Sequence, residues 1–135
     1  MSDQAWLEAF VHAHGGVAGS VHRRMGEVLE ATAFCRIPEE VQRLTATIPL
    51  GKGMAGLAWS RGVPVSTCNL ATDATGDVRP GARAVAAQAA VALPVFEDEG
   101  RVRAVVGLAF AHEVLPTLDV LLAAAAHLPP TSRRD

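Results

Sequence analysis

Residues 48–65 read IPLGKGMAGLAWSRGVPV, and they join a short apolar run to a helix through closely spaced glycines. The β-branched run over residues 45–50 predicts a strand that ends at the proline and the first glycine. Residues 54–61 then predict a short helix between glycines, and residues 63–67 predict a further strand. This stretch therefore predicts a tight strand–helix–strand unit.

Gly51, Gly53 and Gly56 also match G-x-G-x-x-G, the glycine pattern of dinucleotide-binding loops, and Asp73 follows near the expected distance. Such a site needs a parallel βαβ unit whose helix N-terminus receives the pyrophosphate. The flanking sequence predicts antiparallel hairpins instead, and Asp73 falls in a polar segment beyond its strand. We therefore interpret the glycines as residues that permit a tight turn and close packing.

The sequence before this stretch predicts a helix and a hairpin. An amphipathic helix is expected over residues 3–14, because apolar residues recur at helical spacing and two glycines follow. Two antiparallel strands are expected over residues 17–24 and 27–36, separated by Gly26. The second strand alternates in the β manner through Val28, Glu30, Thr32 and Phe34. A short turn of helix over residues 38–41 leads into the central stretch.

The strongest hairpin signal lies later, over residues 89–96 and 101–111. Both faces of the second strand are apolar, so we expect the sheet to be covered on both sides and Pro94 to occupy a bulge or an unpaired position. A broad apolar helix is predicted over residues 117–128. Either this helix only packs on the sheet together with the first helix, or both terminal helices also form a dimer interface.

Two blocks of this sequence resemble the GAF domain family. The first is residues 48–65, and the second is AVALPVFEDEG at residues 90–100 followed by VVGLAF at 105–110. The resemblance implies an α+β fold of the GAF/PAS kind. It has a central antiparallel sheet of five to six strands, terminal helices on one face and a loop-covered pocket on the other. It also implies one domain over residues 1–130, a stand-alone member of the family, followed by a flexible tail over residues 131–135.

The resemblance places the pocket among the short helix, the strand after it, a polar loop over residues 69–83 and the start of the late hairpin. Its polar side chains are the candidate ligand-binding residues: Trp59, Ser66, Cys68, Asn69, Asp73, Arg79, Arg83 and Gln88. The alternative is that the polar loop is only a solvated connection.

The resemblance favours a sensory or regulatory module that binds a small ligand and acts through a homodimer or a signalling partner protein. Fold does not determine the ligand, and the sequence names neither ligand nor cofactor. The first alternative is a ligand-free dimerisation or interaction protein. In that case Trp59, Leu70 and Val78 would fill the pocket, and the association surface would be the whole function.

The second alternative is a thiol enzyme, because free methionine-R-sulfoxide reductases form one branch of the family. The resemblance would put cysteines near Ala55 and Arg83, and this chain has neither. Cys35 and Cys68 lie elsewhere; Cys68 is a candidate reactive thiol, although buried, unreactive cysteine is the commoner role. We therefore predict no catalytic residues and no enzymatic activity.

Composition indicates which classes of partner the protein binds and in which cellular compartment it is found. Twelve basic and fourteen acidic residues give a net charge of −2, which offers no electrostatic reason to expect a nucleic-acid or membrane partner. The paucity of cysteine and the absence of a signal-peptide pattern favour a cytoplasmic protein, and the alanine- and arginine-rich composition favours a bacterial one. His12 and His14 point in different directions on their helix, so no metal site is expected.

Overall fold

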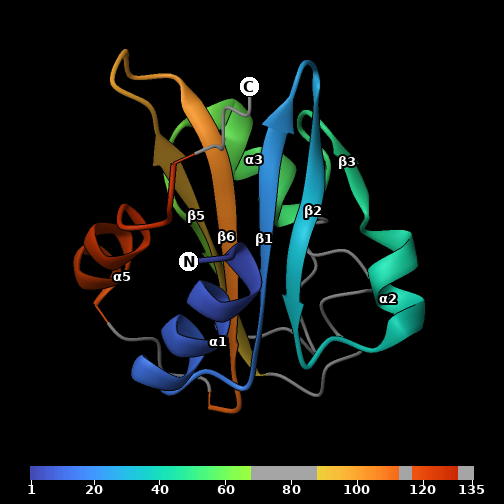
Figure 1. Cartoon of the computed structure of the whole chain (residues 1–135), viewed down its shortest axis with the longest axis vertical. Helices are drawn as coiled ribbons and strands as arrows, with labels where there is room; N and C mark the ends of the chain where they lie inside the picture. Colours follow the sequence, from blue (N-terminus) through green and yellow to red (C-terminus); the bar gives the residue numbers. More distant parts are fainter. Residues whose placement is uncertain (68–87, 113–116, 131–135) are drawn as a thin grey trace.

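The computed structural model describes residues 1–67, 88–112 and 117–130. Each predicted helix and strand within these residues is present, with ends that differ from the predictions by a few residues (Figure 1). In chain order the elements are α1 (Asp3–Ala13), β1 (Ala18–Met25), β2 (Val28–Cys35), α2 (Glu39–Leu44), β3 (Thr47–Pro49), α3 (Gly53–Arg61), β4 (Val65–Thr67), β5 (Ala89–Phe96), β6 (Val102–Phe110) and α5 (Leu118–Ala125). None of the described helices has the length and apolar character needed to cross a bilayer.

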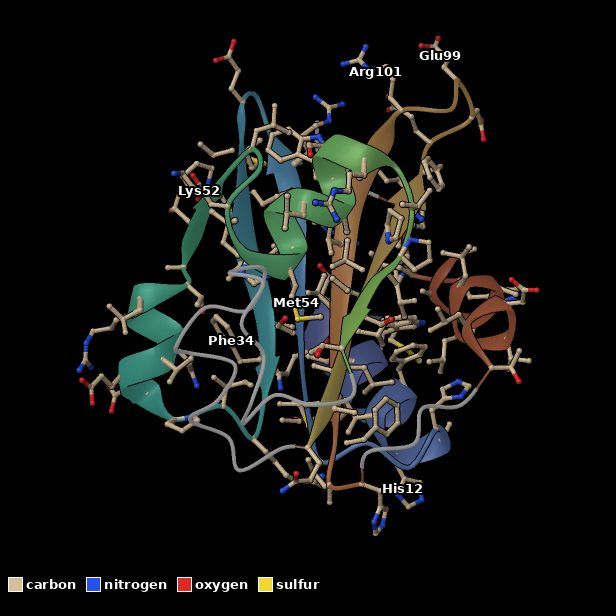
Figure 2. All side chains as sticks on the ribbon, turned by 180° about the vertical axis from the view of Figure 1, so that it is seen from behind. His12, Phe34, Lys52, Met54, Glu99 and Arg101 are labelled. Carbon is tan, nitrogen blue, oxygen red and sulfur yellow. The ribbon has the colours of Figure 1, made fainter. Side chains whose placement is uncertain are left out.

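The strands form one six-stranded sheet in the order β3-β2-β1-β6-β5-β4. All of its described pairings are antiparallel, and the two hairpins meet where β1 pairs with β6. Strands β3 and β4 lie at opposite edges, so α3, which joins them in sequence, must cross one face of the sheet (Figure 2). The glycine-rich stretch therefore belongs to an edge-to-edge crossover and not to a parallel dinucleotide-binding unit.

Both faces of the sheet are covered, as predicted. Helices α1 and α5 lie on one face and α3 lies on the other (Figure 1). The larger core fills the space under α1 and α5, where Leu7, Phe10, Leu121, Ala125 and Leu128 are almost entirely buried. The apolar stripe of α5 thus packs against the sheet together with α1. The fold is the α+β arrangement implied by the resemblance, with the terminal helices on one face.

The glycines of the central stretch serve the turn and the packing. Gly51 has a φ of +81°, a left-handed conformation that favours glycine. Its amide N–H donates to the carbonyl of Gly56 over 3.0 Å, which closes the turn between β3 and α3. A Cβ atom on Gly56 would lie 2.6 Å from the carbonyl oxygen of Pro49. The interpretation from sequence is therefore confirmed.

We expect Gly56→Ala to lower the free energy of unfolding by about 2 kcal/mol, because the new methyl group would push α3 away from the backbone of β3. Urea unfolding followed by circular dichroism measures this loss. The matched control is Ser60→Ala on the exposed side of the same helix, which should change stability by less than about 0.5 kcal/mol. Equal stability of the two variants would contradict the packing role of Gly56.

Pro94 is predicted at a bulge or at an unpaired position, and it occupies the second of these settings. It lies opposite Val105 in an unbroken register with β6, and the irregularity comes one residue later, between Val95 and Phe96, so the bulge is not at Pro94. On its other side, the described pairing with β4 ends at Ala92, so the missing N–H of Pro94 interrupts no hydrogen bond there.

Candidate ligand-binding site

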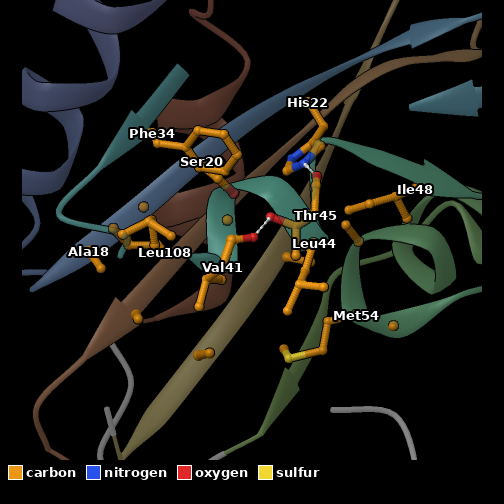
Figure 3. A pocket seen from close by; sticks show the side chains of 18 of the residues that line it. Ala18, Ser20, His22, Phe34, Val41, Leu44, Thr45, Ile48, Met54 and Leu108 are labelled. Atoms are coloured by element: carbon orange, nitrogen blue, oxygen red, sulfur yellow. Dashed lines mark hydrogen bonds between the residues drawn. The ribbon is translucent and has the colours of Figure 1, made fainter. Parts of the chain in front are cut away.

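A cavity of about 420 Å³ lies on the face of the sheet opposite α1 and α5 (Figure 3). Its floor is a patch of small side chains on three neighbouring strands: Ala18 and Ser20 on β1, Ala90 and Ala92 on β5, and Gly107 and Ala109 on β6. Helix α3 packs on bulkier residues of another part of the same face, among them Leu29 on β2 and Val102 and Val105 on β6. The sheet is therefore hollow where its side chains are short and α3 does not cover it.

The walls of the cavity are mainly apolar. They come from α2, β3 and the first turn of α3, through Val41, Leu44, Ile48 and Met54. Lys52 is the one charged side chain among the described lining residues, and it is exposed. A cavity of this size and character is typical of sites for small, largely uncharged molecules.

His22 is the most deeply buried polar side chain of the cavity wall, with 2% of its surface exposed. Its Nε2 atom lies 2.7 Å from the carbonyl oxygen of Thr45 (Figure 3). Because a carbonyl oxygen can only accept, Nε2 carries the proton and donates it. The other ring nitrogen, Nδ1, is buried and has no hydrogen-bond partner.

Burial keeps the His22 ring neutral. Loss of hydration lowers the pKa of His22 below its ordinary value, and the hydrogen bond to Thr45 opposes this shift only in part. With Nε2 protonated in a neutral imidazole, Nδ1 is a hydrogen-bond acceptor. The cavity wall thus contains an acceptor whose hydrogen-bonding capacity is unused.

A β-bulge brings Phe34 beside His22. Val21 lies opposite Ala33 and His22 lies opposite Ala31, so Thr32 is an extra residue in β2. One extra residue moves every following side chain to the other face of the sheet. Phe34 consequently lines the cavity and contacts His22 in a T-shaped arrangement, with ring centroids 5.9 Å apart. The alternation expected from the sequence, with Thr32 and Phe34 on one face, is interrupted at this point.

The backbone of Phe34 is also held by α1. The side-chain amide of Gln4 donates to the carbonyl of Phe34 over 2.7 Å and accepts from its N–H over 3.3 Å. These bonds occupy the outer edge of β2 beyond Glu30, the last residue of β2 that pairs with β3. A residue of the cavity wall is thereby connected directly to the first terminal helix.

The candidate residues chosen from sequence do not line this cavity where they are described. Trp59 lies in a separate depression near Arg24 and Phe96, while Ser66 and Gln88 are exposed. The remaining candidates lie outside the described residues: Cys68, Asn69, Asp73, Arg79 and Arg83. Their assignment as ligand-binding residues stays a prediction. The short helix does contribute to the cavity wall as expected, but through Met54 at its start rather than Trp59.

The positions relevant to thiol chemistry are the two cysteines and Ala55. Cys35 is buried in the core beneath α1, on the face of the sheet away from the cavity. Ala55, where the resemblance would put a cysteine, lines the cavity and carries no thiol. Cys68 lies outside the described residues. No described thiol therefore reaches the cavity.

Comparison with solved structures identifies the architecture. The chain is similar to the type II free methionine-R-sulfoxide reductase of Thermoplasma acidophilum, with 15% identity, a TM-score of 0.70, and coverage of 93% of this chain and 84% of that one. The GAF domain of an Acinetobacter phosphoenolpyruvate-protein phosphotransferase gives 13% identity, a TM-score of 0.70, and coverage of 93% and 74%. An NreA protein from Staphylococcus aureus, mutated in its nitrate binding site, is 14% identical with a TM-score of 0.69. The match covers 89% of this chain and 96% of that one.

At these identities the similarity shows the fold alone, which is GAF-like. No protein-family model matches the chain, and no curated protein matches its sequence.

Proposed function

We propose that this GAF-like chain is a sensory or regulatory module that binds a small, mainly apolar molecule in the cavity between the sheet, α2 and α3. The observation that carries the proposal is the cavity itself: about 420 Å³ with a floor of alanine, glycine and serine and walls of larger apolar side chains. Short side chains at the floor have no packing advantage unless something else occupies the space, since cavities destabilise a core. Binding of a ligand is the simplest use of such a site.

Among the fold's known uses, the character of the lining favours an organic ligand over a small inorganic anion. NreA is a nitrate-binding relative in fold. Here the described lining residues include a single, exposed lysine, and His22 is neutral and so supplies no positive charge. An anion in this cavity would lose its hydration, and no described lining residue is a buried cation that could replace it. An uncharged ligand avoids that cost.

Binding is also favoured over thiol-dependent reduction, although the fold is shared with free methionine-R-sulfoxide reductases. Thiol chemistry needs an accessible thiolate close to the substrate. Among the described residues the cavity has no cysteine, and Cys35 is sequestered on the other face. The reductase hypothesis therefore depends on Cys68. Cys68→Ser with no change in turnover of oxidised methionine would remove it.

The module would act through its terminal helices. Occupation of the cavity would press on Phe34, and the two hydrogen bonds between Phe34 and Gln4 connect that strand to α1. A ligand can shift the position of α1 only by binding its two positions with different affinity. A second subunit or a partner protein that contacts α1 or α5 would then bind with altered affinity.

The proposal is tested by native mass spectrometry and thermal unfolding of freshly purified protein with a metabolite library. We expect a retained small molecule, or a ligand that raises Tm by about 10 °C at a hundredfold excess over Kd. Ala109→Leu should abolish that shift, because a leucine at this buried floor position would project into the cavity and obstruct the ligand. Ala123→Leu, the same change at an exposed position on α5, should preserve it.

A bare protein with no thermal shift from any compound would favour the ligand-free interaction protein instead. A shift that survives in Ala109→Leu as fully as in Ala123→Leu would show that the ligand binds elsewhere. Either result contradicts the assignment of this cavity as the functional site.

A further inference from the structure

The unused acceptor of His22 defines what the cavity can recognise. The ring is fixed at one end, because Nε2 donates to the Thr45 carbonyl over 2.7 Å. At the other end Nδ1 is buried without a hydrogen-bond partner. Buried polar atoms in proteins are almost always hydrogen-bonded, so an unpaired one in a cavity wall indicates a partner that arrives with the ligand.

We propose that the ligand is an uncharged, mainly apolar molecule with a hydroxyl or N–H group, and that this group donates a hydrogen bond to Nδ1 of His22. The inference rests on the proposed function and specifies its ligand. The alanine and glycine floor would contact the apolar part of the ligand, and His22 would fix its orientation.

The surroundings of His22 explain why the donor should be uncharged. The described lining residues include no carboxylate that could accompany an ammonium group into the cavity, and their single cation is the exposed Lys52. A buried neutral imidazole accepts a hydrogen bond from a hydroxyl or an N–H without bringing a charge out of water.

Phe34 packs against the ring that carries the acceptor. Its ring lies against the His22 ring in T-shaped contact, and Nδ1 is shielded from water. A change of side-chain rotamer at Phe34 or His22 is therefore part of binding, and changes of this size are common when ligands enter. Since Gln4 bonds the backbone of Phe34, a displacement of this residue on binding would also reach α1.

The test compares probes in which a methyl group replaces the hydrogen of the donor: indole with 1-methylindole, and 2-naphthol with 2-methoxynaphthalene. Affinities are measured by ligand-observed NMR at pH 8, where His22 is neutral. We expect each donor-bearing probe to bind about fivefold more tightly than its methylated counterpart. In His22→Phe this ratio should fall to nearly one, and His22→Gln, which keeps an amide donor and an acceptor, should restore part of it.

The outcomes separate this inference from the function on which it rests. If both members of each pair bind the wild-type protein equally and Ala109→Leu abolishes their binding, the cavity binds small molecules but His22 does not select a donor. If no probe binds the wild-type protein, the cavity is not a site for molecules of this kind, and both proposals fail. The wild-type comparison stands even if His22→Phe does not fold.

Discussion

Asp3→Asn is expected to lower the free energy of unfolding by about 3 kcal/mol, because it breaks a nearly buried ion pair and leaves a charge behind. The Asp3 carboxylate accepts from Nε and Nη2 of Arg23 over 2.7 and 2.8 Å. Their side chains are only 14% and 9% exposed. Urea unfolding at pH 7 measures the loss. The matched control is Asp119→Asn, an exposed acid in the first turn of α5, which should cost less than about 1 kcal/mol.

The effect of Asp3→Asn should disappear in acid. Hydrogen bonds from Arg23 lower the pKa of Asp3, while burial opposes the shift. A carboxyl group whose pKa is depressed by folding stabilises the protein fully above its unfolded pKa, near 4, and loses that contribution as the pH falls through its folded pKa. The difference in stability between wild type and variant should therefore shrink below about pH 4. A difference that stays constant down to pH 2 would mean that the carboxylate charge is not responsible.

The Asp3–Arg23 pair belongs to a network that joins both ends of the described domain. Arg23 also donates to the carbonyl of Pro129 over 2.6 Å, and Arg103 donates to the carbonyls of Leu128 and Pro129. These carbonyls belong to the segment that follows α5, which ends at Ala125. The network therefore fixes the start of α1 and the end of α5 to neighbouring strands. A ligand-induced movement of the terminal helices would therefore have to strain or break these hydrogen bonds.

The fold could be predicted from the sequence because its elements have regular periodicity and clear boundaries. The glycine-rich stretch predicted a short helix between two strands, and the apolar faces of β6 predicted a sheet covered on both sides; both are present. The apolar stripe of the closing helix likewise predicted the residues that are buried, such as Leu121 and Leu128. These features depend on local patterns, which are visible in one sequence.

The cavity could not be placed in the same way. Its floor of small residues is scattered over three strands that are distant in sequence and adjacent only in the sheet. Phe34 reaches the cavity through a bulge at Thr32, and no glycine or proline marks that bulge in the sequence. Most of the polar residues predicted for the site follow β4 in the sequence. His22 was not predicted, because its burial and its unpaired Nδ1 result from tertiary packing and leave no mark in the sequence of its strand.

Leu121→Ala is expected to lower the free energy of unfolding by about 3 kcal/mol, because Leu121 is completely buried on the inner side of α5 and truncation of its side chain leaves a cavity in the larger core. Urea unfolding gives the measurement. Val120, the preceding residue, is 57% exposed, so Val120→Ser should change stability by less than about 0.5 kcal/mol.

The same pair of variants separates the two roles left open for α5. If the outer surface of the helix is a dimer interface, Val120→Ser should weaken association in sedimentation velocity without loss of stability in the monomer, since an exposed valine contributes mainly when a partner covers it. If α5 only covers the sheet, Leu121→Ala alone should have an effect, and the sedimentation of Val120→Ser should match that of the wild type. A stable Leu121→Ala protein would contradict the packing role of α5 and would require a different route from the cavity to any partner.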